Sequence, residues 1–223
     1  MTSARSETNA KLLQAIRRGE AGTVSSLLAA GADPDAADAE GRTALIYAAS
    51  INMSNVRRGE IVAALLKQGA DPDRADARGK TPLHEAAVSG QWDVMTALLE
   101  RGANINAQSS AGATPLHAAA SIAMVTGRLE TLDFLLKSGA NSAFRNEQNL
   151  TALELAVKNP SKMIYASTVA SRLQAWDDAK PDDVKRADIG LATQREQREA
   201  ARLRESQLRE TARKAAARLK LKP

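Results

Sequence analysis

The sequence predicts an all-α protein in which short pairs of helices stack in a row, and three observations support this fold class. A six-residue motif, TPLHEA at Thr81–Ala86, recurs 33 residues later as TPLHAA at Thr114–Ala119. Of the 223 residues, 43% are hydrophobic but only 3% aromatic, so small aliphatic side chains must build the core. A separate marker, Leu-Leu-x-x-Gly-Ala, has its glycine at Gly31, Gly69, Gly102 and Gly139.

Both markers repeat with the same steps along the chain. The four marker glycines follow one another after 38, 33 and 37 residues. Weaker copies of the motif begin at Thr43 and Thr151, so four motif threonines can be compared. The residues two positions before these threonines are separated by the same three steps; they are Gly41, Gly79, Gly112 and Asn149. Two independent markers with identical steps indicate a true repeat of about 33 residues.

Each element of one unit follows from its residues. Thr81 is a typical N-cap, and Pro82 stands at the first helical position, where its missing N–H costs nothing. The Leu-Leu pair belongs to a second, longer helix, and the marker glycine suits the left-handed conformation that ends it. Asp-Pro-Asp, as at Asp71–Asp73, is typical of a turn. Each unit therefore predicts a turn, a short helix, a loop, a longer helix and another turn.

The motif and its period resemble those of the ankyrin-repeat family. The resemblance covers about residues 9–176 and implies a solenoid of helix-turn-helix units with hairpin-like turns. We divide it into five units, which are 9–38, 39–76, 77–109, 110–146 and 147–176. Outside it we expect a flexible N-terminus (1–8), a linker (177–192) and a basic C-terminal helix (193–223). The resemblance implies a structural role for the two motif histidines. With them, the repeat residues to which we assign a structural role are Thr81, Pro82, His84, Thr114, Pro115, His117, Gly31, Gly69, Gly102 and Gly139.

Units two and four are longer than the others. Five extra residues lie between Ala49 and Ile61, and four lie between Ala120 and Thr131. These insertions either lengthen a helix or form a protruding loop, on the same side of the stack. Their apolar side chains either anchor a partner or fold back onto their own helices, and the sequence favours neither reading; they are Met53, Val56, Met124 and Val125.

The basic charge of the chain is confined to its last forty residues. Residues 1–183 hold 19 Lys and Arg against 21 Asp and Glu, whereas residues 184–223 hold 12 against 5. A capping box at Thr193–Glu196 opens a helical composition that runs to about Lys220. Three interpretations stay open: a helix that caps the last unit, a helix that docks onto a partner, and a segment that binds phosphate or an anionic membrane.

The sequence argues against an enzyme. It has no Cys and only two His, too few for a zinc site, and it lacks phosphate-binding and nucleophile motifs. We therefore expect no catalysis, no metal and no cofactor. No apolar run approaches the roughly 20 residues of a membrane span. We expect a cytoplasmic protein, with an export signal removed earlier as the alternative.

The resemblance implies a non-catalytic protein that binds another protein as a scaffold, adaptor or inhibitor, with no need to form oligomers. In the family, partners meet the hairpin tips and the exposed face of the first helices. Three alternatives remain: a self-protection inhibitor of a bacterial enzyme, nucleic-acid or anionic-membrane association through residues 184–223, and a regulatory domain whose tail mediates self-association. By position, and together with the insertion residues, the candidate partner-binding residues are Glu40, Arg42, Ser50, Arg78, Lys80, Val88, Ser110, Ala113, Ser121, Glu147 and Gln148.

Overall fold

The computed structural model describes residues 2–50, 55–158 and 164–179. The chain divides into two compact units, Met1–Asp178 and Ala179–Pro223. The predicted basic helix, residues 193–223, lies outside the described residues, as does most of the predicted linker. The description below therefore concerns the first unit alone.

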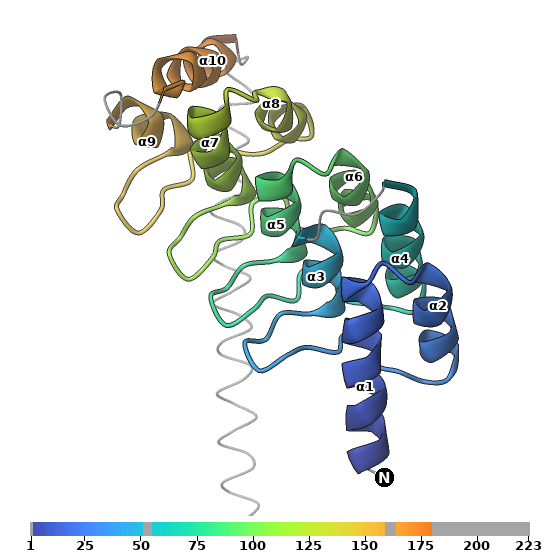
Figure 1. Ribbon diagram of the computed structural model, residues 1–223. Helices are drawn as coiled ribbons and strands as arrows, with labels where there is room; N and C mark the ends of the chain where they lie inside the picture. Colours follow the sequence, from blue (N-terminus) through green and yellow to red (C-terminus); the bar gives the residue numbers. More distant parts are fainter. Residues whose placement is uncertain (1, 51–54, 159–163, 180–223) are drawn as a thin grey trace, which may run out of the picture. The chain divides into compact units, whose positions relative to one another are not determined.

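The described part of the first unit is a stack of helix pairs without a β-sheet (Figure 1). The first helices of the pairs are α1 (Thr2–Arg17), α3 (Ala44–Ser50), α5 (Pro82–Ser89), α7 (Pro115–Thr126) and α9 (Ala152–Lys158). The second helices are α2 (Ala21–Ala29), α4 (Asn55–Lys67), α6 (Trp92–Glu100), α8 (Glu130–Lys137) and α10 (Ala166–Ala179). The predicted all-α repeat solenoid is thereby confirmed.

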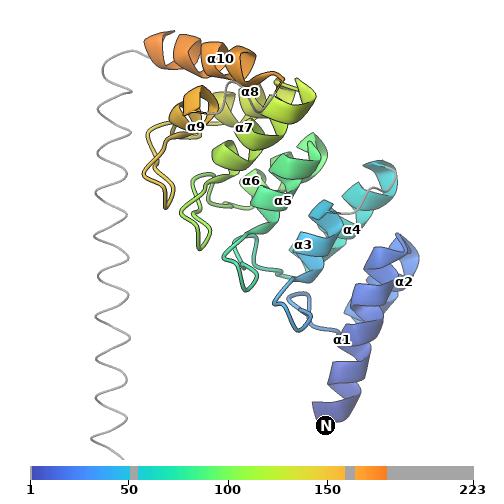
Figure 2. The same ribbon diagram turned by 60° about the vertical axis from the view of Figure 1, so that its left-hand side comes forward.

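Two rows of helices run along the stack. Helices α1, α3, α5, α7 and α9 pack successively on one another, and α2, α4 and α6 form the second row. Turns extend beyond the first row and join each pair to the next (Figure 2). We call the four of them the hairpins; they are residues 33–42, 71–80, 104–113 and 141–150.

The motif residues start α5 and link it to the next unit. Thr81 and His84 form a capping box at the start of the helix, with Pro82 in its first turn. His84 Nδ1 accepts a hydrogen bond from the Thr81 backbone N–H and lies 2.9 Å from the Thr81 hydroxyl oxygen. On its other side, His84 Nε2 lies 2.9 Å from the carbonyl oxygen of Ala113, in the following hairpin. Each motif histidine thus joins a helix start to the neighbouring unit, because His117 makes the same contacts with Thr114 and Leu150.

Backbone hydrogen bonds join each hairpin to the next at the tips. The hairpin tips approach one another so closely that position 79 requires a glycine. Gly79 has a φ of +72°, and a Cβ there would lie 2.6 Å from the Ser110 nitrogen. Asn149 takes the equivalent conformation in the last copy, with a φ of 59°. The three bonds run from Ala77 N to Glu40 O (3.0 Å), from Ser110 N to Arg78 O (2.9 Å) and from Glu147 N to Ala111 O (2.8 Å).

A second set of contacts joins the bases of the hairpins. Asp33 Oδ1 accepts from the N–H of Asp35 within one turn, which is the expected turn chemistry. The Asp35 side chain then accepts from the backbone of the next unit. These links between units run from Asp71 N to Asp35 (2.9 Å), from Asn104 N to Asp73 (2.8 Å) and from Asn141 N to Asn106 (2.8 Å).

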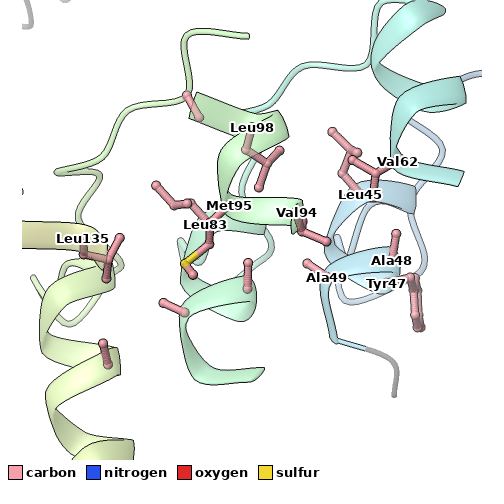
Figure 3. Packing of buried hydrophobic residues seen from close by; sticks show 14 of the residues in the cluster. Leu45, Tyr47, Ala48, Ala49, Val62, Leu83, Val94, Met95, Leu98 and Leu135 are labelled. Carbon is pink, nitrogen blue, oxygen red and sulfur yellow. The ribbon is translucent and has the colours of Figure 1, made fainter. Parts of the chain in front are cut away.

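Aliphatic side chains between the two rows form one continuous core (Figure 3). Leu45, Leu83 and Leu116 of the first helices are almost completely buried. Leu98 and Leu135 of the second helices are fully buried and meet them from the other row. Small aliphatic side chains therefore build the core, as the low aromatic content predicted.

The structure differs from the sequence prediction at both ends of the repeat. Helix α1 begins at Thr2, so residues 2–8 are helical where we predicted a flexible N-terminus. The ion pairs Glu7–Lys11 (2.7 Å) and Arg5–Asp33 (3.5 Å) support this extra length. At the other end α10 continues to Ala179, into the predicted linker.

The extra residues of the long units extend helices. In unit four, α7 has 12 residues where α5 of unit three has 8. In unit two, α4 has 13 residues where α6 has 9. The α7 extension ends at Gly127, which adopts the left-handed conformation with a φ of 74°.

Candidate partner-binding surfaces

Most of the predicted partner-binding residues line one surface, made of the hairpins and the first helices. We call it the inner strip. The exposed members are Glu40, Arg42, Ser50, Arg78, Ser110, Glu147 and Gln148, and the half-buried ones are Lys80, Val88, Ala113 and Ser121.

The charges of the inner strip are largely paired with one another. Arg42 Nε lies 2.9 Å from Asp38 Oδ2, and a second contact of 3.5 Å joins Arg42 to Glu40. In other units the pairs are Lys80–Glu85 (3.1 Å) and Arg145–Glu154 (2.7 Å). Of the five charged residues of the strip, Arg78 and Glu147 are exposed without an ion pair to the described residues.

A tyrosine lies between two arginines at the N-terminal end of the strip. The Tyr47 side chain of α3 is covered by the guanidinium groups of Arg17, 4.5 Å from the ring centroid, and Arg42, 5.0 Å from it. The hydroxyl of Tyr47 donates to Asp38 Oδ2 at 2.6 Å and accepts a hydrogen bond from Arg17. Cation–π stacking and hydrogen bonds thus order four side chains from α1, α3 and the first hairpin.

The environment of Asp38 stabilises its charged form. Partial burial alone would raise the pKa of this carboxyl. The hydrogen bonds from the Tyr47 hydroxyl and from the Arg42 backbone and guanidinium outweigh burial, and they lower its pKa to about 2. Asp38 is therefore an anion throughout the physiological pH range.

An open groove of about 930 Å³ adjoins the Tyr47 cluster. Arg5, Asn9, Leu13 and Arg17 line it from α1, and Asp38 lines it from the first hairpin. Arg17 makes no ion pair with any residue that the structure describes. The groove thus has a cation available for a carboxylate from outside.

The comparisons with known proteins agree with this architecture. Residues 12–109 match the family model described as Ankyrin repeats (3 copies), and residues 111–147 match the model described as Ankyrin repeat. Together the two matches cover more than half of the chain. The chain belongs to the ankyrin-repeat family. A search of the curated proteins finds no match to it.

Ankyrin repeats generally mediate protein–protein interactions, and proteins built from them are typically non-catalytic binding modules. Among the described residues no helix is long and apolar enough to cross a membrane. Within the same residues, no three His, Asp or Glu side chains come close enough together to hold a metal ion.

The two histidines of this ankyrin chain each link one unit to the next. Both rings are buried and hydrogen-bonded between Thr backbones and the next hairpin. Burial lowers the pKa of His84 and of His117 from the ordinary value of 6.5. Both rings are therefore neutral near pH 7, and neither faces an open site.

The insertion residues divide between the two roles left open by the sequence. Met124 is only 1% exposed and belongs to the core, so the prediction that it anchors a partner is wrong. The lengthened α7 turns this side chain inward and leaves its neighbour Val125 55% exposed. Met53 and the side chain of Val56 lie outside the described residues.

Sequence reasoning missed the Tyr47 cluster. Tyr47 occupies the variable position of the ankyrin motif, where units three and four have Glu85 and Ala118. A large aromatic at that position was the available signal. Its contact with Arg17, which is 30 residues away, could be found only from the fold.

Proposed function

We propose that this ankyrin chain is a non-catalytic module that binds another protein through its inner strip and through the extended connections of units two and four. Scaffold, adaptor and inhibitor are the roles that such a module fills. Stacked units hold the surface in one conformation before binding, so little entropy is lost on association.

The observation that carries this proposal is the Tyr47 cluster beside the open groove. Tyr47 is only 5% exposed, so its role is to orient Arg17, and arginine is one of the residue types enriched among binding hot spots. The cluster is ordered before any partner arrives, since Asp38 holds both Tyr47 and Arg42. The exposed Arg17 guanidinium offers a carboxylate of the partner both charge and a flat stacking surface.

Two narrower roles remain proposals. A self-protection inhibitor of a bacterial enzyme requires the same kind of rigid binding surface, although the only support for it is analogy between proteins of one fold. Nucleic-acid or anionic-membrane association rests on the excess of 12 Lys and Arg over 5 Asp and Glu in residues 184–223. That second role predicts an affinity that falls steeply with salt.

Charge reversal at the groove tests the proposed function. The partner is first captured by cross-linking the full-length chain in the source cell, then purified and titrated. We expect Arg17→Glu to weaken its binding by about tenfold or more. Arg17 is exposed and makes its hydrogen bond only to Tyr47 among the described residues, so the variant should remain folded by circular dichroism.

Lys137→Glu is the matched control because Lys137 is an exposed cation in the last turn of α8, on a second helix. It should leave the affinity unchanged. Equal weakening by both variants would indicate general electrostatic attraction and would contradict a site at the groove. A measured turnover of any substrate would contradict the non-catalytic role.

A further inference from the structure

The exposed apolar side chains are concentrated at a second surface. We call it the connection edge: in units two to five, the described side chains where a first helix leads into its second helix, namely Arg57, Trp92, Val125, Arg128, Glu130, Val157, Lys158, Ile164 and Tyr165. All the large hydrophobic side chains that are exposed among the described residues lie there. They are Trp92 (49% exposed), Val125 (55%), Val157 (59%), Ile164 (84%) and Tyr165 (39%).

Contacts between successive units run along the connection edge from unit two to unit five. Between units three and four, a Cβ at Gly90 would lie 3.5 Å from the Thr131 hydroxyl oxygen. Arg58 at the start of α4 meets Asp93 at the start of α6, at 3.5 Å. Tyr165, just before α10, donates its backbone N–H to the carbonyl of Met124 in α7 at 3.0 Å. The Tyr165 ring also covers Gly127, where a Cβ would approach within 3.1 Å. The exposed apolar residues are therefore neighbours along one edge of the stack.

The connection edge also carries an excess of positive charge. Arg57, Arg128 and Lys158 are exposed and make no ion pair with the described residues. The exposed acidic residues without an ion pair there are Glu130 and, one turn further along α4, Glu60. Asp93 is already paired with Arg58. A combination of apolar side chains and unneutralised cations fits a partner that is apolar on one face and acidic beside it.

The spacing of the units suits a helical partner. Neighbouring helix layers lie about 8–10 Å apart, and seven residues of an α-helix advance about 10.5 Å. A helix lying along the edge can therefore place one apolar residue against each successive unit. Recognition of an amphipathic helix through regularly spaced apolar anchors is a common binding mode.

We propose that the connection edge docks an acidic amphipathic helix of a partner protein. The edge includes the extended connections of units two and four, so the inference rests on that part of the proposed function and not on the Tyr47 groove. The basic segment 184–223 of the chain itself is the wrong occupant, because its net positive charge would be repelled by the cations of the edge.

Fluorescence of Trp92 reports on docking directly. In the full-length Trp176→Phe chain, Trp92 is the one remaining tryptophan. The probes are a synthetic amphipathic peptide of about 21 residues, with a leucine seam and glutamates beside it, the same peptide with lysine for glutamate, and phosphatidylserine vesicles. We expect a blue shift of the Trp92 emission with the acidic peptide alone.

Two substitutions then locate the contact. Val125→Asp should weaken the acidic peptide by about tenfold or more, and it replaces an exposed side chain, so folding should be preserved. Ser138→Asp adds the same charge at the exposed far end of α8 and should have no effect. Arg17→Glu should also leave peptide binding unchanged, which separates this surface from the inner strip.

Several results would overturn the inference. One is the absence of a shift with the acidic peptide up to about 1 mM. Others are equal shifts with both peptides, or a shift with vesicles but not with the acidic peptide. If deleting residues 184–223 alone red-shifts the Trp92 emission, the chain's own segment occupies the edge and the proposal is wrong.

Discussion

Each motif histidine uses both of its ring nitrogens in the folded chain. His84 Nε2 lies within hydrogen-bonding distance of the Ala113 carbonyl oxygen, which can only accept, so Nε2 must carry a proton. Nδ1 accepts from Thr81, so it carries none. A neutral ring satisfies both contacts, whereas a protonated ring would place an N–H against the N–H of Thr81. Stability should therefore depend on the protonation of these residues.

The lowered pKa values predict a loss of stability in mild acid. In the unfolded chain each histidine takes up a proton near its ordinary pKa of 6.5, whereas burial lowers the pKa of His84 and His117 in the folded chain. The unfolded state therefore binds more protons below pH 6.5, and the free energy of unfolding falls as the pH decreases. Urea denaturation at pH 7.5 and about pH 5.5 measures this difference.

The double variant His84→Gln/His117→Gln provides the control. It should be less stable at pH 7.5 by about 1–3 kcal/mol per site, through lost hydrogen bonds, and it should lose most of the change between the two pH values. Asp38 does not contribute to the change in stability between pH 7.5 and about pH 5.5, because its pKa of about 2 lies far below these values. An equal pH-dependent loss in the parent and the variant would show that other groups cause it.

At the scale of one helix, the start of the first helix differs between units. Pro82 and Pro115 are buried at the first helical positions of α5 and α7, whereas α3 and α9 begin with Ala44 and Ala152. The two alanines are not equivalent. Ala44 donates its N–H to the carbonyl of Ala36 at 2.9 Å, while the N–H of Ala152 has no partner among the described residues.

Proline substitution should therefore have opposite effects at these two positions. Ala152→Pro removes an N–H that makes no bond and restricts the unfolded chain, so it should stabilise the protein by about 0.4–1 kcal/mol. Ala44→Pro removes the bond to Ala36 and should destabilise it by about 1 kcal/mol or more. Thermal unfolding of both variants beside the parent measures the two changes. Destabilisation by Ala152→Pro would show that its N–H or its backbone angle matters after all.

The helix ends could be predicted from the sequence because local chemistry determines them. Thr81 with Pro82 starts a helix, and the marker glycine Gly102 takes the left-handed conformation just after the end of another. The Tyr47 cluster could not be predicted in the same way, because it joins residues from three elements. The burial of Met124 also required the fold, since it depends on how far α7 extends before turning.

At the scale of the whole stack, every contact between units that we describe joins two neighbouring units. The motif histidines, the bonds between hairpin tips and the side-chain contacts at the hairpin bases all connect adjacent units. Stability in such an array is approximately a sum of unit and nearest-neighbour terms. A defect in the middle should therefore act first on the units beside it.

Leu98 and Leu99 of α6 provide a matched pair for this expectation. Leu98 is fully buried, whereas its neighbour Leu99 is partly buried at the edge of the core. Leu98→Ala should cost about 2–5 kcal/mol, because it removes a side chain and leaves a cavity in the middle unit. Leu99→Ala should cost less, since water can fill part of the space it leaves.

Hydrogen exchange of the two variants shows where the stack loosens. In Leu98→Ala we expect the largest loss of amide protection in α5 and α6, a smaller loss in α3, α4, α7 and α8, and the least in α1 and α2. This gradient follows because each unit is held only by its neighbours. A uniform loss of protection from α1 to α10 would indicate a single cooperative unit, and the nearest-neighbour description would then be wrong.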